Sequence, residues 1–472
     1  MQREQSLIDF NDITLAQRWL CRRWLHLGVL SLGLAGLFAI LLVLSRMPGS
    51  EAFFPWIDFF HTALVVHVDQ SVLIWFLSMA GLVGSFLMPP SERLWIWQWL
   101  AFAMALIGTV GIAFSAFVGE GAPLMNNYVP VLQRPFFFYM LGLFSFGITL
   151  QAILVFSSGS LLFDHSSRRI HLPTLAGLTL SVTVLVALLA VITAWWQMPG
   201  EVEGQGYYEY LFWGGGHTLQ FAYTQLIMLA WLLLAWRSGA RIPGDGRWYA
   251  GLLLLGAMPV VLVPLINLLY DTVSLESRTA FTRLMQYGGG LAVIPLGALV
   301  LWGLIKSPDS DPVQRPLRRS LWMSLLLFFA GGLIAMFISG VNTIIPAHYH
   351  GSIVGVTLAL MGLAYLLLPR LGYAPVQGRL AQWQPWIYGS GQLLHIGGLA
   401  ASGALGIQRK TAGAAQGLDS LSAKLAMGVM ALGGLLAVIG GILFVWIMLR
   451  AFHSGANDSG ISDHFMNRFG GG

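Results

Sequence analysis

The chain has 472 residues, of which 56% are hydrophobic and only 10% are charged, with a formal net charge of +5. A soluble globular domain carries roughly 25% charged residues, so this composition excludes a soluble enzyme or binding domain. Apolar stretches of the ~20 residues needed to cross a bilayer recur along the chain. We therefore predict an all-α integral membrane protein. The single cysteine, Cys21, excludes an internal disulfide and a thiolate metal cluster.

Twelve apolar stretches define the predicted transmembrane helices, and an even number places both termini on one side. Their bounds are near 24–45, 59–88, 95–118, 133–162, 172–198, 209–236, 247–270, 283–304, 318–341, 345–369, 385–405 and 424–450. With the termini inside, only seven of the 25 Lys and Arg residues lie outside: Arg46, Arg134, Arg278, Arg283, Arg409, Lys410 and Lys424. Cytoplasmic loops are enriched in basic residues. This bias predicts cytoplasmic termini and a multi-pass protein of a bacterial inner membrane, in contact with lipid and without a nucleic-acid partner.

The twelve helices form one predicted membrane domain over residues 1–453. Residues 454–472 are rich in Gly, Asp and Ser and are expected to be a flexible tail. The opening segment to Leu20 is polar and has no apolar core of its own, so we do not expect a cleaved signal peptide.

Four histidines share one predicted depth in the membrane. His67, His217, His348 and His350 each follow the outer end of a helix that runs inward. At 1.5 Å per residue they lie within roughly 5–15 Å of the outer boundary. Ligand-capable side chains inside a membrane are rare and usually functional. The pattern indicates a shared layer of prosthetic groups, although each histidine could instead be an isolated residue that hydrogen-bonds between helices.

The segment Ala347–Gly351 reads Ala-His-Tyr-His-Gly. Residues two apart on an α-helix point about 200° from each other, so His348 and His350 cannot bind one metal ion. They can each bind a separate metal on opposite faces, and imidazole is a common axial ligand of haem. Ala347 and Gly351 would let flat macrocycles approach the backbone. The spacing therefore suits two haems that flank one helix.

These residues resemble subunit I of the haem–copper oxidase superfamily, which includes cytochrome c oxidases and nitric oxide reductases, over essentially the whole chain. The resemblance implies a twelve-helix bundle in which His348 holds a high-spin haem. It implies that His67 and His350 hold a low-spin haem, and we expect both haems to be of b type. His217, at the end of Trp-Gly-Gly-Gly-His, matches the histidine that binds a distal Cu or Fe.

The same resemblance implies that basic residues after the eleventh span, Arg409 and Lys410, meet the haem propionates. His395, within that span, has either a role next to haem or a packing role. Asp69, two residues after His67, is a carboxylate inside the membrane. It either pairs with a neighbour or carries protons.

Three departures from the family pattern concern the distal site. The family has two further histidines on span seven, whereas this sequence has Ile266 and Asn267 there and no histidine between His217 and His348. The nearby substitutes are Asn267 and Asp271 as metal ligands, with Gln220 and Tyr270 as further catalytic candidates. The family's crosslinked tyrosine of span six is replaced by Phe221. The lysine of span eight and the acidic residues of span six that feed protons are absent, so proton pumping is not expected.

The resemblance implies a respiratory oxidoreductase that reduces NO to N2O or O2 to water at the high-spin haem. Electrons would come from an outer cytochrome c or cupredoxin, through a small membrane-anchored partner subunit and the low-spin haem. The altered distal ligands favour NO. Two alternatives stay open: a b-haem electron-transfer or sensor protein that has lost the copper site, and a transporter-like bundle with coincidental histidines. Transporters tend to show inverted repeats, which the sequence lacks.

Overall fold

The protein is described by a computed structural model that covers residues 13–45, 58–88, 91–158, 163–164, 169–308, 311, 313–409 and 420–454. Nearly all of these residues are helical. The first six spans are α2 (Leu15–Leu44), α3–η2–α4 (Phe59–Val68, Asp69–Ile74, Trp75–Leu87), α5 (Glu92–Phe114), α6 (Pro135–Ser157), α7 (Leu172–Gln197) and α8 (Gly204–Arg237). Two short antiparallel hairpins, β1 (Pro123–Leu124) with β2 (Val131–Leu132) and β3 (Phe163–Asp164) with β4 (Arg169–Ile170), lie between spans.

The remaining spans complete the predicted set. They are α9–η4–α10 (Gly246–Ala257, Met258–Val261, Leu262–Leu269), α11–α12 (Leu275–Gly288, Val293–Lys306), α13 (Arg315–Ala335), α14 (Ile344–Leu367) followed by η5 (Pro369–Leu371), α15 (Arg379–Ala404) and α16 (Leu421–Ser454). Among the described residues, eleven spans are long and apolar enough to cross a membrane. The twelfth long helix, α15, has 26 residues, and its glutamines lower its hydropathy. The predicted all-α membrane bundle is confirmed.

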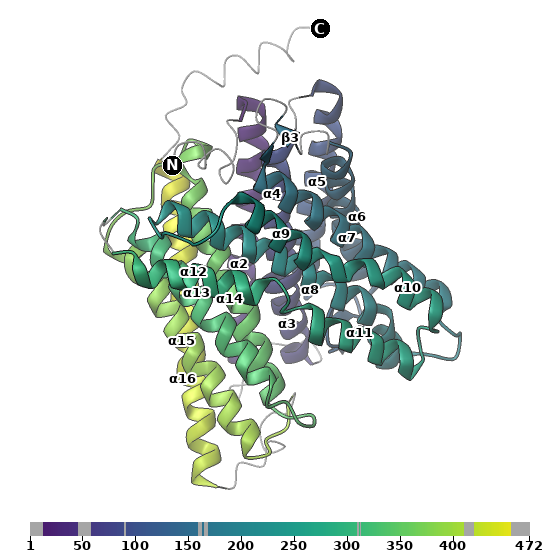
Figure 1. Cartoon of the computed structure of the whole chain (residues 1–472). Coiled ribbons are helices and arrows are strands. Elements are labelled where there is room, and N and C mark those ends of the chain that lie inside the picture. Colours follow the sequence, from purple (N-terminus) through teal and green to yellow (C-terminus); the bar gives the residue numbers. More distant parts are fainter. Residues whose placement is uncertain are drawn as a thin grey trace.

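The helices form a bundle of antiparallel neighbours, α5 with α6, α7 with α8, α13 with α14 and α15 with α16 (Figure 1). The chain returns to its starting helix, because the ring of His26 in α2 lies 4.3 Å from the ring of Phe452 in α16. The start of α2 and the end of α16 therefore lie on one face, as an even number of spans requires. We call this face the predicted inner face.

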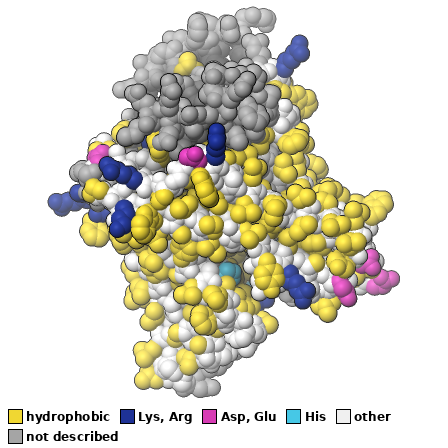
Figure 2. Space-filling model, in the orientation of Figure 1, with side chains coloured by type: hydrophobic (Ala, Val, Ile, Leu, Met, Phe, Trp, Pro, Cys, Tyr) yellow, Lys and Arg dark blue, Asp and Glu magenta, His cyan; other side chains and the backbone are white. Residues whose placement is uncertain are grey.

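Three spans form the centre of the bundle. The most apolar windows of α3–η2–α4, α8 and α14 are 78%, 89% and 78% buried inside the protein, whereas no other such span exceeds 50%. These are the three spans that carry the four histidines predicted at one depth. The visible surface around them is mostly apolar, with charged side chains near its edges (Figure 2). A side chain on a central span faces other helices, so its polar groups need partners within the protein.

Three spans are interrupted inside the membrane. A π-helix, Asp69–Ile74, follows His67 directly, and the N–H of Trp75 bonds the carbonyl of Gln70 across five residues. A 3-10 turn at Pro259 separates α9 from α10, and the segment 289–292 separates α11 from α12. A Cβ on Gly288 would lie 3.0 Å from Pro259, so the breaks of these two spans meet. Irregular backbone is tolerated at membrane depth where protein covers it.

Candidate haem-binding site

His67 and His350 lie close together on different central spans. The Nδ1 atom of His67 is 2.9 Å from the Ala35 carbonyl of α2, and the Nδ1 atom of His350 is 2.8 Å from the Pro346 carbonyl one turn earlier. A carbonyl accepts only, so in both rings Nδ1 carries the hydrogen and Nε2 keeps its lone pair. No described residue hydrogen-bonds either Nε2 atom. The two imidazoles interact electrostatically with each other.

His395 of α15 stands beside this pair. Its ring centroid lies 5.1 Å from that of His350, at an interplanar angle of 61°. Its Nδ1 atom is 2.9 Å from the Met430 carbonyl of α16. A third imidazole, on another helix, is therefore oriented in the same way as the two predicted ligands.

His348 points to the other side of α14. Its Nδ1 atom is 2.8 Å from the Gly331 carbonyl of α13, and no described residue hydrogen-bonds its Nε2 atom. Helices α13 and α14 meet backbone to backbone here, because a Cβ on Gly331 would lie 2.5 Å from the Ser352 nitrogen, and one on Gly351 would lie 2.6 Å from the Gly331 Cα. The expectation that Gly351 leaves room for a macrocycle is therefore wrong: helix α13 fills that space.

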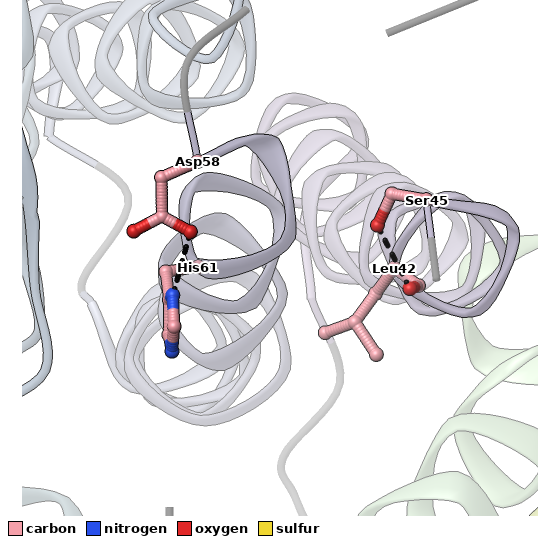
Figure 3. Close-up of polar contacts among 4 residues, drawn as sticks. All are labelled: Leu42, Ser45, Asp58 and His61. Atoms are coloured by element: carbon pink, nitrogen blue, oxygen red, sulfur yellow. Dashed lines mark hydrogen bonds and ion pairs between the residues drawn. The ribbon is translucent and has the colours of Figure 1, made fainter. Parts of the chain in front are cut away.

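His61 lies apart from the other histidines. Its Nδ1 atom is 2.6 Å from Oδ1 of Asp58 at the start of α3, and both side chains are exposed (Figure 3). The same view shows Ser45 donating to the Leu42 carbonyl at the end of α2. His61 is thus a surface residue that pairs locally.

These residues fit the two predicted haems. A haem iron takes the lone pair of a neutral imidazole, and a hydrogen bond from the other nitrogen fixes the ring and raises its basicity. His67, His350 and His348 all have this arrangement. Arg409 interacts electrostatically with Tyr349, and its buried Nε has no hydrogen-bond partner among the described residues. A propionate would satisfy this guanidinium. Lys410 lies outside the described residues.

His217 of α8 differs from these histidines in that both of its nitrogens are paired. Nδ1 lies 2.8 Å from the Trp213 carbonyl and Nε2 lies 2.9 Å from the Tyr128 hydroxyl. The side chain of His217 is 5% exposed. Tyr128 comes from the turn between β1 and β2, and its ring centroid lies 4.8 Å from that of His217. Burial, reinforced by the carboxylate of Glu209, raises the pKa of Tyr128 above its ordinary value, so at neutral pH the phenol is protonated and donates to Nε2.

The glycine run before His217 admits three different neighbours. A Cβ on Gly214 would lie 2.8 Å from the Phe281 ring of α11, one on Gly215 would lie 2.4 Å from Val191 of α7, and one on Gly216 would lie 2.2 Å from the Tyr128 ring. The absence of side chains lets all three neighbours close around the turn that ends at His217. This run was the one sequence signal that could have pointed to a close partner of His217.

The residues predicted to complete the distal site do not gather around His217. Tyr270 is 38% exposed and Asp271 is exposed, at the end of α10 and just beyond it, and Gln220 is half-buried on α8. Helix α10 is fixed to α7, because Gln197 donates to the Asn267 carbonyl at 3.2 Å and accepts from Thr272 at 2.8 Å. Among the described residues no group of three His, Cys, Asp or Glu could hold a metal ion. Among the described residues, the rings in contact with His217 are those of Tyr128, Trp213 and Phe281, and no second histidine contacts it.

Asp69 is 1% exposed at the start of the π-helix. Neither carboxylate oxygen has a hydrogen-bond partner among the described residues. Its neighbour Gln70 donates to the Thr109 carbonyl of α5 at 2.8 Å, but its own Oε1 is also unpartnered within the described part of the chain. No described side chain therefore pairs with Asp69.

The chain is similar to known proteins over most of its length. It is 32% identical to an uncharacterised protein of Rickettsia prowazekii (strain Madrid E), over 91% of this chain and 95% of that protein. It is 29% identical to an uncharacterised protein of Aquifex aeolicus (strain VF5), over 77% of this chain and 88% of that protein.

A cryo-EM structure of a heme-copper terminal oxidase dimer contains a chain with the same fold. The TM-score is 0.62 at 16% identity, and the match covers 94% of this chain and 84% of that chain. A family model described as "Cytochrome C and Quinol oxidase polypeptide I" matches residues 20–443. The resemblance seen in the histidine motifs is thereby confirmed, and the chain belongs to the haem–copper oxidase subunit I family of membrane-bound respiratory oxidoreductases.

Proposed function

We propose that this chain is a two-haem membrane oxidoreductase that carries electrons from the predicted outer side to a high-spin haem, where a small gas, NO or O2, is bound and reduced. The observation that supports this most directly is the common orientation of His67, His350 and His348. Each ring has Nδ1 on a backbone carbonyl and an Nε2 atom with no partner among the described residues. His67 and His350 would be the two axial ligands of a low-spin haem b, and His348 the single protein ligand of a high-spin haem b.

When bound, the haems supply one-electron transfer and a vacant coordination site for a gas. The chain's own residues supply orientation. The carbonyls of Ala35, Pro346 and Gly331 hold the Nδ1 hydrogens, so each Nε2 keeps the lone pair that iron requires. Arg409, half-buried and with an Nε atom that has no partner among the described residues, offers a cation for a propionate. Because His348 and His350 share one helix, the two haems would be coupled through α14.

Electrons would enter at the predicted outer face from a cytochrome c or cupredoxin, through a small membrane-anchored partner subunit. NO is favoured over O2, because Phe221 stands where the family's crosslinked tyrosine is expected and the distal donors do not fit a metal. Reduction of two NO to N2O consumes two electrons and two protons and needs no proton pumping. The orientation with both termini in the cytoplasm of a bacterial inner membrane belongs to this proposal.

The test is spectroscopy and turnover of the full-length protein in detergent. We expect the pyridine haemochrome to report two b haems per chain, the reduced-minus-oxidised spectrum to show both, and CO to bind one of them. The reduced protein should then consume NO faster than O2. A purified, folded chain without haem would overturn the proposal. If the protein contained haem but did not bind CO, gas reduction would be contradicted and only the electron-transfer part of the proposal would stand.

A second candidate function is a b-haem sensor or electron carrier that binds a gas without reducing it. The hydrogen bond between Tyr128 and His217 favours it, since it occupies the nitrogen that a distal metal would need. Turnover separates the two functions. A sensor would bind CO and NO at the ferrous haem, and an electron donor would not drive their consumption.

A further inference from the structure

We propose that His217 binds no metal ion, that Tyr128 takes the place of the metal as its partner, and that this pair faces the gas bound at the His348 haem. Tyr128 is then a positioning residue, which holds the His217 ring. This inference rests on the proposed function for the haem itself. The two phenol–imidazole partners come from the β1–β2 turn and from α8, which are 89 residues apart in the sequence.

The nitrogens of His217 argue against metal binding. Nδ1 must carry the ring hydrogen, because it faces the Trp213 carbonyl at 2.8 Å. Nε2 is then the only lone pair of the ring, and it accepts from the Tyr128 hydroxyl at 2.9 Å. A metal ion at Nε2 would have to displace Tyr128. At the three haem histidines the same lone pair has no described partner.

The neighbouring helices bring apolar side chains to His217, since Ile266 of α10 and Phe281 of α11 pack in one cluster with Trp213. The Gln197 bridge fixes the end of α10 to α7. On the α11 side, the neighbour of His217 is Phe281, whose ring centroid lies 6.2 Å away. An aromatic hydrocarbon ring offers no donor atom for Cu or Fe. One histidine with both nitrogens paired and a phenylalanine beside it do not make a metal site.

The position of Tyr128 is built by several contacts. Asn126, 5% exposed, accepts from the backbone N–H of Tyr128 at 3.0 Å and from that of Val129 at 2.9 Å. Its neighbour Asn127 donates its backbone N–H to Glu209 at 3.0 Å, which ties the turn to α8. The buried guanidinium of Arg134 donates to the carbonyls of Ser115 and Ala116 at 2.5 and 3.1 Å, which closes the base of the loop. The backbone on both sides of Tyr128 is thus fixed, by Asn126 within the turn and by Arg134 at the base of the loop.

Gly216 completes this arrangement. Its missing side chain leaves the space that the Tyr128 ring fills, and Trp213 packs edge-on against that ring at 5.7 Å. The ring of Trp213 is itself fixed, since Nε1 donates to the Arg278 carbonyl at 3.2 Å and the Arg278 guanidinium lies 4.6 Å over it. Tyr128, Trp213 and His217 therefore form one packed aromatic group, whose polar atoms include the Tyr128 hydroxyl and the His217 ring nitrogens.

The experiment measures metals and the CO complex on the same full-length protein. We expect all iron to be accounted for by haem and copper to be far below one per chain, even after growth in added copper. Tyr128→Phe and His217→Ala should leave the haem content unchanged. Each should shift the C–O stretching frequency of the ferrous CO complex, and by the same amount, because the two groups act as a pair.

Two variants separate a positioning role from a general packing role. Gly216→Ala should displace the Tyr128 ring and reproduce the shift while keeping the hydroxyl. Tyr365→Phe removes a buried hydroxyl away from His217, bonded to Gln384 at 3.1 Å, and should leave the stretch unchanged.

One copper or one non-haem iron per chain that is lost in His217→Ala would overturn this inference while leaving the haem proposal intact. An unchanged C–O stretch in Tyr128→Phe would also overturn it. A chain without haem would instead contradict the proposed function, and the metal content of the wild type and of His217→Ala would still decide whether His217 binds a metal.

Discussion

His67 and His350, at the junction of α3 and α14, were predicted at the same depth as His217 of α8, yet the two regions have different surroundings, and His395 of α15 joins the first. His67, His350 and His395 each present an Nε2 atom with no described partner, and all three have Nδ1 on a carbonyl. His217 has the same Nδ1 contact, but a hydroxyl on Nε2. The first region leaves nitrogens that would suit the proposed haem, whereas in the second both ring nitrogens have partners within the protein.

The difference teaches that a free second nitrogen is required of a histidine ligand, although it does not by itself make the histidine one, as His395 illustrates. A backbone carbonyl at Nδ1 occurs in both regions and therefore does not distinguish a ligand from a structural residue. What distinguishes them is the neighbour at Nε2, which comes from another part of the chain. The predictions below test this distinction, from the largest expected effect to the smallest.

The largest effect is expected when an axial ligand is removed. His350→Ala should abolish the low-spin haem signal and keep CO binding, since His348 is on the opposite side of α14. His348→Ala should give the reverse, with CO binding lost and the low-spin signal kept. Turnover should fall by at least about 100-fold in both, because loss even of a group that only supports a ligand costs 10–100-fold. Identical spectra from the two variants would contradict separate haems on one helix.

Within the first region, the comparison can be sharpened by His67→Ala and His395→Ala. We expect His67→Ala to lose the low-spin haem. His395→Ala should keep it and lower turnover by about 10–100-fold, because its ring packs on His350 and positions it. Optical spectra of the two reduced variants provide the measurement. A loss of low-spin haem only in His395→Ala would make His395 the ligand.

The backbone contact that holds His348 can be tested with two adjacent glycines. Gly331→Ala would place a Cβ 2.5 Å from the Ser352 nitrogen, whereas a Cβ on Gly332 would meet nothing within 4 Å. Overpacking of this kind costs about 1–3 kcal/mol, so Gly331→Ala should lower the Tm in detergent and weaken CO binding. Gly332→Ala should match the wild type. Equal Tm values would contradict the close contact.

The smallest effect concerns the link between the two regions. Ser324 of α13 accepts from the Trp231 indole of α8 at 2.8 Å and donates to the Gly355 carbonyl of α14 at 2.6 Å. Ser324→Ala should cost about 1 kcal/mol, the size of hydrogen bonds between membrane helices, and lower the Tm slightly. Ser320→Ala loses only a bond within α13, to Pro316, and is the control. If Ser320→Ala lowered the Tm more than Ser324→Ala, the hydrogen bonds of Ser324 between helices would not contribute more to stability than a bond within one helix.

The sequence was sufficient to locate the spans, because their length and apolarity are dictated by the bilayer. The predicted span 172–198 is α7 (Leu172–Gln197), and 345–369 is α14 (Ile344–Leu367). The three central spans were also identifiable, since an imidazole inside the membrane needs protein around it.

The partners of these histidines could not be predicted in the same way. No pattern in the sequence points to Tyr128, because its contact with His217 depends on how the turn between β1 and β2 folds over α8. Gly351 was interpreted as space for a macrocycle, and only the position of α13 shows that Gly331 fills it. Such contacts join distant segments, and neither periodicity nor composition records them.

The π-helix at Asp69–Ile74 has a consequence for the evolution of this span. A π-helical turn contains one residue more than the α-helical turn it replaces, so it marks the position of a single-residue insertion. We expect relatives that lack this residue to have a continuous α-helix, in which the side chains on both sides of the turn keep the same faces, because the wider turn absorbs the extra residue. An alignment of this span should therefore carry a one-residue gap within 69–74. Deleting Gln70 should restore a regular α-helix and leave both His67 and Trp75 on their present faces.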